Sequence, residues 1–502
     1  MLKSAQKITE LVKNPLFINS SWGIISQVVQ SLLLSLFFIL IARNYTTQIF
    51  ANFIIATVLY QLLTAFSSLG LSQWFIREIA GNDKREIVIN RFIKLQFYSG
   101  VTFYFINIAL SYLLYNDRLI HILTLLLGIN IIFDNLINSI KWINISEFKQ
   151  KKSFIIQSTE TLLKFIATCF LLITPFSIIT LSIILIVIRF ATLNLFLSLG
   201  SSKLINFKLL LLQEISLKYV KQLVIRNWPF IIIGSVSIIN WRISTIIISK
   251  ALSSIDVANY EISYRIFSLA QMLPIAISTT VFPTLVILFN KGKNTDLSTF
   301  YRKVHVFYLL FGILSFTFIY SFIDFLLPSL FGLNYAGTGI YTKQMFLTIL
   351  VFPTAFLQSN VLVAMKYEKW DMWFNVISLI INFSFCIIGI YFFKSLSVIN
   401  ISIFSGFLIF HILQDIILVN KKISSLKHVL EFYILSAFSI LSYVVLDKLV
   451  NSVFLFVGYW LIILSLYFGI TKFQLISKTK IFTNTIIKKE DKKKIPEIYS
   501  CL

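Results

Sequence analysis

The chain has 502 residues, of which 57% are hydrophobic and only 13% are charged, and its formal net charge is +23. Soluble domains carry about 25% charged residues, and a soluble fold leaves much of its chain at the surface, so this composition argues against a soluble protein. The apolar runs are long and do not alternate with period two, and backbone groups in lipid must pair internally. Membrane-spanning helices are therefore expected rather than a barrel.

In chain order, a polar segment at residues 1–21 carries Lys3, Lys7 and Lys13, and the apolar run that follows reads as an uncleaved first span rather than a signal peptide. The lengths of the apolar runs predict about 14 membrane-spanning helices. The expected spans lie near residues 22–42, 49–70, 95–115, 119–140, 155–174, 176–199, 229–250, 265–289, 305–328, 344–365, 371–393, 397–420, 430–447 and 453–471.

The basic residues are distributed unequally between the two sides of the predicted membrane. Most Lys and Arg residues fall in the segments that share a side with the N-terminus, including the run from Lys488 to Lys494 near the C-terminus. Short basic loops stay in the cytoplasm, so both termini are expected to be cytoplasmic. Because this charge lies between spans rather than on one face, nucleic acid is not an expected partner.

The spans fall into two halves that resemble each other. Ala51-Asn52-Phe53 opens the second span of the first half, and Ala258-Asn259-Tyr260 opens the corresponding span of the second half. Both copies face the same way, which predicts a parallel repeat about an axis along the membrane normal. The expected parts are a first six-helix bundle at 1–200, an amphipathic cytoplasmic linker at 201–228, a second six-helix bundle at 229–420, two further helices at 421–471 and a basic cytoplasmic tail at 472–502.

Two stretches of the first 290 residues resemble a known family. Asn19, Trp22, Ala42-Arg43, Gly70-Leu71 and Arg77-Glu78 match the pattern around the first two spans of O-antigen and polysaccharide flippases. These proteins belong to the multidrug/oligosaccharidyl-lipid/polysaccharide (MOP) superfamily, together with the multidrug and toxin extrusion (MATE) transporters and the lipid II flippases.

The second matching stretch also contains departures from the family pattern. Arg242, Tyr264-Arg265 and Pro283 match, but Trp241 stands where the family often has an aspartate. Asn52 and Asn259 replace usual glycines. These departures leave the transfer of ion-coupling residues open.

The resemblance implies an all-α, MATE-like integral membrane protein of the bacterial inner membrane. Such proteins move undecaprenyl-diphosphate-linked oligosaccharide from the cytoplasmic to the periplasmic leaflet by alternating access. No organic cofactor is implied, while membrane lipids and other polysaccharide assembly proteins are the further partners to expect.

Charged residues within spans are costly and usually functional, and arginine suits a diphosphate because its planar group binds bidentately. Arg242, in the middle of the seventh span, is the first candidate. Lys164 follows Glu160 by four residues, which favours an intrahelical ion pair. The candidate cargo-binding cations are Arg242, Arg189, Arg265, Arg77, Arg43 and Lys164.

Three carboxylates lie in or near apolar runs, namely Asp134, Asp324 and Asp415. Each is a candidate to bind a coupling ion, H⁺ or Na⁺, or to pair with an arginine across the cavity. Sequence alone does not choose among them.

The sequence also bears on two alternative functions, a drug exporter and a polysaccharide polymerase. A MATE-type exporter of cationic drugs would need an acidic cavity, whereas the mid-span charges here lean basic. A membrane polysaccharide polymerase would need a long outer loop or a soluble domain, and the chain shows neither. The GxxxxGK[ST] and HExxH motifs are absent, and the histidines are far apart in sequence, so neither ATP hydrolysis in the chain nor metal chemistry is predicted.

Overall fold

The computed structural model describes residues 15–81, 85–147, 149–199, 205, 216–292, 294–449 and 453–465. Residues 1–14 of the polar N-terminal segment, residues 201–204 and 206–215 of the linker expected at 201–228, and the tail expected at 472–502 lie outside these residues. The chain divides into two compact units, Met1–Ser436 and Ala437–Leu502.

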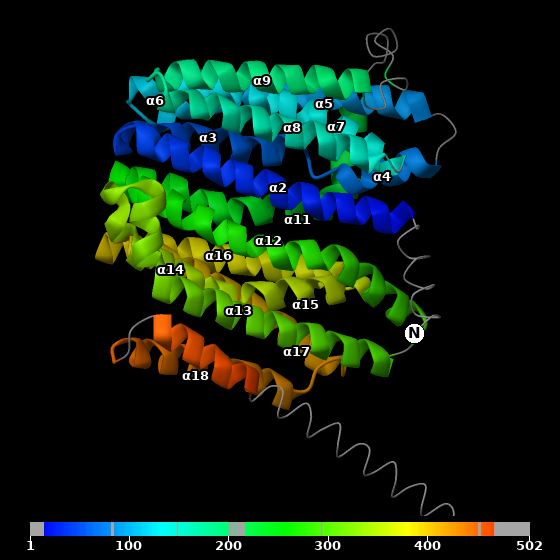
Figure 1. Cartoon of the computed structure of the whole chain (residues 1–502). Helices are drawn as coiled ribbons and strands as arrows, with labels where there is room; N and C mark the ends of the chain where they lie inside the picture. The colour runs from blue at the N-terminus through cyan, green and yellow to red at the C-terminus, as the bar shows by residue number, and fades with distance from the viewer. Residues whose placement is uncertain are drawn as a thin grey trace, which may run out of the picture. The chain divides into compact units, whose positions relative to one another are not determined.

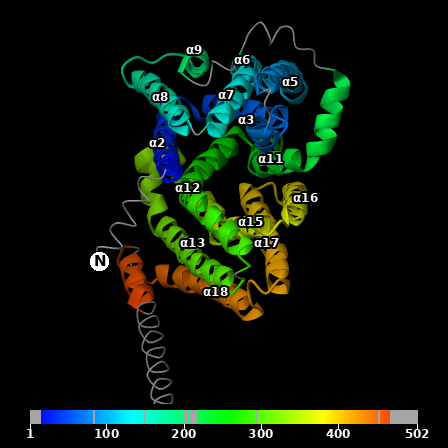
Figure 2. The same cartoon turned by 90° about the vertical axis from the view of Figure 1, so that its right-hand side faces the viewer.

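The described parts of the chain are helical (Figures 1 and 2). The first half contains α2 (Pro15–Asn44), α3 (Thr47–Ser67), α4 (Ser72–Gly81), α5 (Arg85–Leu114), α6 (Arg118–Gly128), α7 (Asn130–Ser146), α8 (Gln150–Cys169), the 3₁₀ turn η1 (Phe170–Leu172) and α9 (Ile178–Leu199). The second half contains α11 (Leu217–Ala251), α12 (Ser254–Asn290), α13 (Asn294–Phe331), η3 (Leu333–Thr338), α14 (Gly339–Met345), η4 (Phe346–Leu350), α15 (Phe352–Ala364), α16 (Glu368–Phe393), α17 (Leu396–Asn420) and α18 (Leu426–Asp447).

Twelve helical segments in the described residues are long and apolar enough to cross a membrane, which confirms a multi-pass membrane protein. Two of the expected spans are not among the twelve. The span expected at 229–250 is the second part of α11, and the one expected at 453–471 is described only over the shorter apolar helix Val453–Ser465.

The two halves pack their helices in the same pattern. In the first half α2 packs on α8, α3 on α5 and α6, and α9 on α7 and α8. The second half repeats each of these pairs, with α11 on α16, α12 on α13 and α14, and α17 on α15 and α16. Between the halves, α3 packs on α11 as α12 packs on α2, and α3 and α12 pack on each other. This is the packing expected of a parallel two-fold repeat.

The helix α12 begins earlier than the sequence predicts. Ser253 and Asp256 form a capping box, in which the Ser253 hydroxyl accepts from the Asp256 N–H at 3.2 Å and the Asp256 carboxylate accepts from the Ser253 N–H at 3.1 Å. The expected span began only at residue 265, because the polar residues before it resemble a loop. Arg265 was therefore placed at a span end, and this was wrong: it lies within α12 and is only 8% exposed.

The second unit is described over the end of α18 and the helix Val453–Ser465. The rings of Tyr443 and Tyr459 meet edge to face at 5.0 Å, and the Tyr459 hydroxyl donates to the Ser439 carbonyl at 3.2 Å. These contacts join the two helices into a hairpin.

Candidate functional site

A cavity of about 790 Å³ lies between the two halves of the first unit. Its wall is built from α3 and α7 of the first half and from α11, α12, α15, α16 and α17 of the second. The charged side chains that line it are Arg242, Asp134 and Asp371. Hereafter it is the central cavity.

Arg242 belongs to an ion-pair triad between α11 and α12. The Glu261 carboxylate lies 3.2 Å from Arg242 Nη1 and 2.7 Å from Arg265 Nη2. Glu261 is fully buried. Two guanidinium groups share one carboxylate, so the triad keeps one positive charge that no member compensates.

Aromatic rings hold Arg242 at the cavity wall. Its guanidinium lies 4.6 Å from the centre of the Tyr264 ring, a contact that stabilises a cation. Trp241 also lines the central cavity, 5.0 Å from the Phe407 ring. At position 241 the wall of the central cavity is therefore aromatic.

A second cavity of about 180 Å³ lies next to the first, and the two share Gln61 and Asp134 in their walls. The cations Lys164, Arg189 and Arg265 line this second cavity. Arg265 lies 3.6 Å from the centre of the Phe38 ring on α2. This contact brings one member of the triad against the other half of the repeat.

The cations of the first half are paired. Arg189 on α9 donates from Nε to Asp134 on α7 at 2.8 Å and from Nη1 to Glu160 on α8 at 2.5 Å. Lys164 pairs with Glu160 at 2.5 Å, so the predicted intrahelical ion pair is confirmed. Asp134 thus pairs with an arginine, one of the two roles expected for it, and the cluster joins three helices.

The charges that face the two cavities are mostly basic. Arg242, Arg265, Arg189 and Lys164 line them, against the carboxylates of Asp134 and Asp371. Glu160 and Glu261, the remaining partners of these cations, have side chains only 5% and 0% exposed. Glu160 and Glu261 are thus more deeply buried than the cations that they pair with, and the cations line the cavity walls.

Sequence reasoning missed two members of this site. Glu261 precedes Arg265 by four residues, and that spacing within a helix was the signal that could have found it. Asp371 near the start of α16 is 3% exposed and accepts hydrogen bonds from Ser359 at 2.7 Å and Gln414 at 2.9 Å. Its position at the predicted end of a span concealed its burial.

Two predicted residues, Arg43 and Asp324, line neither cavity. Arg43 is exposed at the end of α2, and the Arg77 side chain lies outside the described residues. Asp324 was expected in or near the apolar zone, but its side chain is 63% exposed and pairs with Lys343 at 2.6 Å. The charge of Asp324 is therefore already compensated at the surface.

Asp415 lies away from the central cavity, on α17 where it faces α13, α15 and α18. It is 4% exposed, and its carboxylate accepts from Gln358 at 2.7 Å and from the Tyr433 hydroxyl at 3.0 Å. Among the described residues, no group of His, Cys, Asp and Glu is arranged to hold a metal ion.

The halves are joined at one end of the central cavity. Beside the loop from α5 to α6, the Tyr115 hydroxyl lies 2.6 Å from the Ser249 hydroxyl of α11, and the Lys250 ammonium donates to the Leu114 carbonyl. Hereafter these contacts are the end clasp. The cavity lining on α3 begins at Gln61, towards the opposite end of that helix.

Comparison with protein families decides the identity of the chain. A family model described as polysaccharide biosynthesis protein matches residues 16–289, more than half of the sequence. The chain belongs to this family. A second family model, MatE, matches residues 231–388 of the chain. A search of curated proteins found no significant match.

Solved structures of MOP superfamily transporters share the fold. An inward-facing MATE family multidrug resistance transporter is 14% identical, with a TM-score of 0.67, and the match covers 79% of this chain and 95% of that one. An outward-facing MATE family multidrug resistance transporter is 15% identical, with a TM-score of 0.60, and the match covers 83% of this chain and 98% of that one. A MOP superfamily transporter from Pyrococcus furiosus is 14% identical, with a TM-score of 0.58, and the match again covers 83% of this chain and 98% of that one. The chain is a multi-pass transporter of this superfamily.

Proposed function

We propose that this transporter is a flippase for undecaprenyl-diphosphate-linked oligosaccharide, the repeat unit of O-antigen or another surface polysaccharide. The observation that carries the proposal is a cavity between the two halves whose wall combines Arg242 with aromatic rings and amide side chains. The cargo has a diphosphate, a sugar chain and a lipid tail, and the cavity offers groups for the first two.

The diphosphate needs cations inside the membrane. Arg242 lines the central cavity, and its ion-pair partner, the Glu261 carboxylate at 3.2 Å, is shared with Arg265. A phosphate oxygen that approaches Arg242 gains charge-assisted hydrogen bonds, and it meets a triad that already has one excess positive charge. Arg265 of the same triad lines the adjoining cavity, in which Arg189 and Lys164 are paired with Asp134 and Glu160.

The sugar chain needs hydrogen-bonding groups and flat apolar faces. Asn138, Asn240, Gln271 and Asn375 supply amides in the wall of the central cavity. The rings that line the same wall are those of Trp142, Trp241, Tyr264, Phe352, Phe356, Phe407 and Phe410. Amide and aromatic side chains together suit a polar oligosaccharide better than a small hydrophobic drug.

The end clasp closes one end of the cavity, and we infer that this end faces the periplasm. Short basic loops stay in the cytoplasm, so we infer that the other end, where the basic loops lie, faces the cytoplasm. The structure then corresponds to the state that loads cargo from the cytoplasmic leaflet of the inner membrane. Alternating access requires the end clasp to open as the opposite ends approach.

The main rival is export of cationic drugs, because two of the structural neighbours are described as multidrug resistance transporters. Basic charges outnumber carboxylates in the two cavity walls, which disfavours a cationic cargo. For the Pyrococcus furiosus transporter, reverse polarity of the binding pocket was taken to suggest a different function. We apply the same reasoning to this chain, and use the charge of the cavity walls to distinguish an anionic from a cationic cargo.

Deletion of the gene in its host, with isotopic labelling of lipid-linked sugars, tests the proposal. The expected result is a build-up of completed single repeat units on the cytoplasmic leaflet and loss of surface polysaccharide, with no ATP hydrolysis required of this chain. Repeat units that reach the periplasm but stay unpolymerised would identify a polymerase instead. Normal surface polysaccharide with raised drug sensitivity would identify an exporter.

A further inference from the structure

Three histidines that are far apart in sequence meet inside the second half of the first unit. His305 on α13, His411 on α17 and His428 on α18 are 2%, 0% and 8% exposed. The His305 ring centre lies 4.9 Å from that of His428 and 6.2 Å from that of His411. The cavities described above do not use this cluster.

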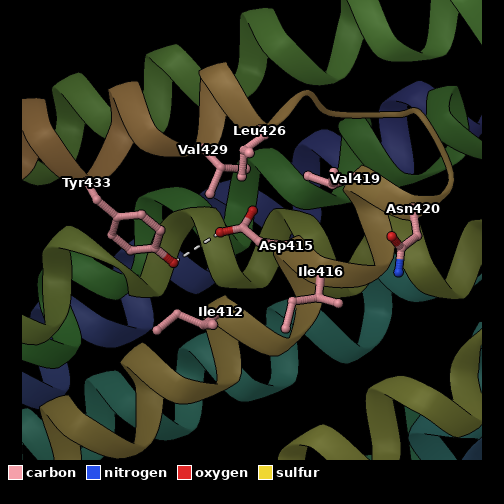
Figure 3. Close-up of a pocket in the computed structure, with 8 residues that line it drawn as sticks. All are labelled: Ile412, Asp415, Ile416, Val419, Asn420, Leu426, Val429 and Tyr433. Atoms are coloured by element: carbon pink, nitrogen blue, oxygen red, sulfur yellow. Dashed lines mark hydrogen bonds between the residues drawn. The ribbon is translucent and has the colours of Figure 1, made fainter.

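The cluster is joined to a buried carboxylate. His411 Nδ1 lies 2.7 Å from the Tyr433 hydroxyl and 3.1 Å from Asp415 Oδ2, and the same hydroxyl donates to Asp415. Figure 3 shows the Tyr433 hydroxyl and the Asp415 carboxylate pointing at each other from α18 and α17. Gln358 on α15 donates to the other carboxylate oxygen at 2.7 Å.

Each histidine of the cluster has one buried ring nitrogen with no hydrogen-bond partner in the described protein. These atoms are His305 Nδ1, His411 Nε2 and His428 Nε2. A buried nitrogen without a partner is costly, and all three belong to the side chain that titrates nearest neutral pH. Such a set of nitrogens suits exchangeable protons better than Na⁺, which prefers oxygen ligands.

We propose that Asp415, His411 and the adjoining His305 and His428 form a proton-binding site. A proton taken up by this group adds an O–H bond at Asp415 or an N–H bond at an imidazole, and it leaves by breaking that bond. With Asp415 ionised and the histidines neutral, the group has one buried negative charge. Uptake of one proton removes this net charge.

Several other ionisable groups face this site from the surrounding helices. From α13 come Tyr301, whose hydroxyl accepts from Gln358 at 3.4 Å, and Arg302, which lies close enough to act on His428. From α18 comes Glu431, 4.0 Å from His428 Nδ1 and 3.9 Å from Lys427. Arg302, Lys427 and Glu431 together carry one positive charge, but they lie outside the buried cluster, since Arg302 and Lys427 are exposed and the Glu431 side chain is 42% exposed. The charge at the centre of the cluster is therefore set by Asp415 and His411.

The site has an opening of its own. Asp415 and Tyr433 line a cavity of about 330 Å³ between α17 and α18, in which Asn420 is the other polar residue and the remaining lining is aliphatic (Figure 3). The cavity touches the last turn of α17, where Asn420 lies. A proton can therefore reach the carboxylate from this end of the helix without crossing the central cavity.

Two pairs of adjacent residues connect the site to the central cavity. On α15, Gln358 donates to Asp415 while Ser359 donates to Asp371. On α17, Gln414 donates to Asp371 at 2.9 Å, next to Asp415 itself. Asp371 lines the central cavity. Loss of the charge on Asp415 therefore changes the hydrogen bonding of α15 and α17, two helices that form the wall of the central cavity. That this coupling serves cargo movement rests on the proposed flippase function.

The test is infrared difference spectroscopy of the purified full chain in lipid nanodiscs during a pH titration without cargo. Because other carboxyl groups also protonate on acidification, the spectrum of each variant is subtracted from that of the parent. We expect one protonated-carboxyl component that is lost in Asp415→Asn and retained in the matched control Asp324→Asn. Tyr433→Phe removes one donor to the carboxylate and should shift the pH at which the band appears. Na⁺ should leave the titration unchanged.

Two results would overturn the proton site: no component lost in Asp415→Asn, or a titration displaced by Na⁺. If Asp415→Asn fails to fold, an unshifted band in folded Tyr433→Phe contradicts the site equally. The coupling is tested separately with Ser68→Cys, in the central cavity. Its alkylation rate, divided by the rate of a free thiol at the same pH because only the thiolate reacts, should change with pH in the parent and not in the variant that also carries Asp415→Asn. A corrected rate that is independent of pH in the parent would overturn the coupling. No cargo is used, so these outcomes are distinct from failure of the flippase proposal.

Discussion

Glu261 holds Arg242 of the neighbouring helix at 3.2 Å and has no exposure to solvent. The same carboxylate holds Arg265 at 2.7 Å. Arg242 lines the central cavity, whereas Glu261, which holds it in place, does not. This arrangement keeps an arginine in place inside the membrane and leaves its charge available to cargo.

Glu261→Gln should destabilise the protein strongly. Two buried guanidinium groups then lose their shared partner, and breaking a buried ion pair costs about 3–5 kcal/mol. The free energy of unfolding, measured by denaturant titration in detergent, should fall by about that amount. The double variant Glu261→Gln with Arg265→Gln restores the original net charge and should be more stable than the single variant. Equal stabilities would show that the triad is not coupled.

Arg242→Ala should abolish complementation of a deletion strain while the protein still inserts in the membrane. Arg242→Lys keeps the charge but loses the planar fork, so its transport should be intermediate. One charge-assisted hydrogen bond is worth about 1.5–3 kcal/mol, so the loss for alanine should be roughly tenfold or more. Arg43→Ala, exposed and away from both cavities, is the matched control. Normal transport by Arg242→Ala would remove this residue from the cargo site.

Arg189→Gln should lower the amount of folded protein. It leaves Asp134 without its arginine and leaves Glu160 with Lys164 alone. The second change Asp134→Asn should recover part of the loss, because it removes the carboxylate left uncompensated. Size-exclusion chromatography of the purified variants measures this. A double variant no better than Arg189→Gln would contradict the pairing as the cause.

Weakening the end clasp should shift the conformational equilibrium. Lys250→Met with Tyr115→Phe removes the ammonium and the hydroxyl whose hydrogen bonds join α11 to the α5–α6 connection. The reporter is Ser68→Cys in a background with Cys169, Cys386 and Cys501 replaced by serine. In the parent, a membrane-impermeant thiol reagent should label Ser68→Cys from the side of the basic loops.

In the clasp variant this labelling should fall, and labelling from the other side should rise. The same substitutions at Lys343 and Tyr320, whose contact lies within one half, serve as the control and should have no effect. Unchanged labelling in the clasp variant would show that the end clasp does not set the state.

The sequence predicted the architecture well because the signal is strong. Long apolar runs and the matching Asn52 and Asn259 segments predict helices and a repeat, and the packing of α2 to α9 recurs in α11 to α17. Helix ends were less predictable. Asp256 and Glu261 read as loop residues, although in α12 the first caps the helix and the second is a buried ion-pair partner.

The site was predictable only in part, because pairing depends on distances between helices. The pair of Lys164 with Glu160 follows from spacing on one helix and was found. The pair of Arg189 with Asp134 joins α9 to α7, and the meeting of His305, His411 and His428 joins three helices. No spacing within a single helix contains that information. Asp324 shows the converse, since an apolar neighbourhood in sequence did not bury it.

The central claim is that the protein moves a diphosphate-linked oligosaccharide across a bilayer. The direct measurement uses the purified protein in vesicles that contain labelled undecaprenyl-diphosphate oligosaccharide, with an added glycosidase that attacks only the outer leaflet. With the protein present, the inner pool should become digestible, whereas empty vesicles and vesicles with Arg242→Ala should keep it protected. An inner pool that stays protected beside folded wild-type protein, in vesicles where a cationic dye is moved, would contradict the account.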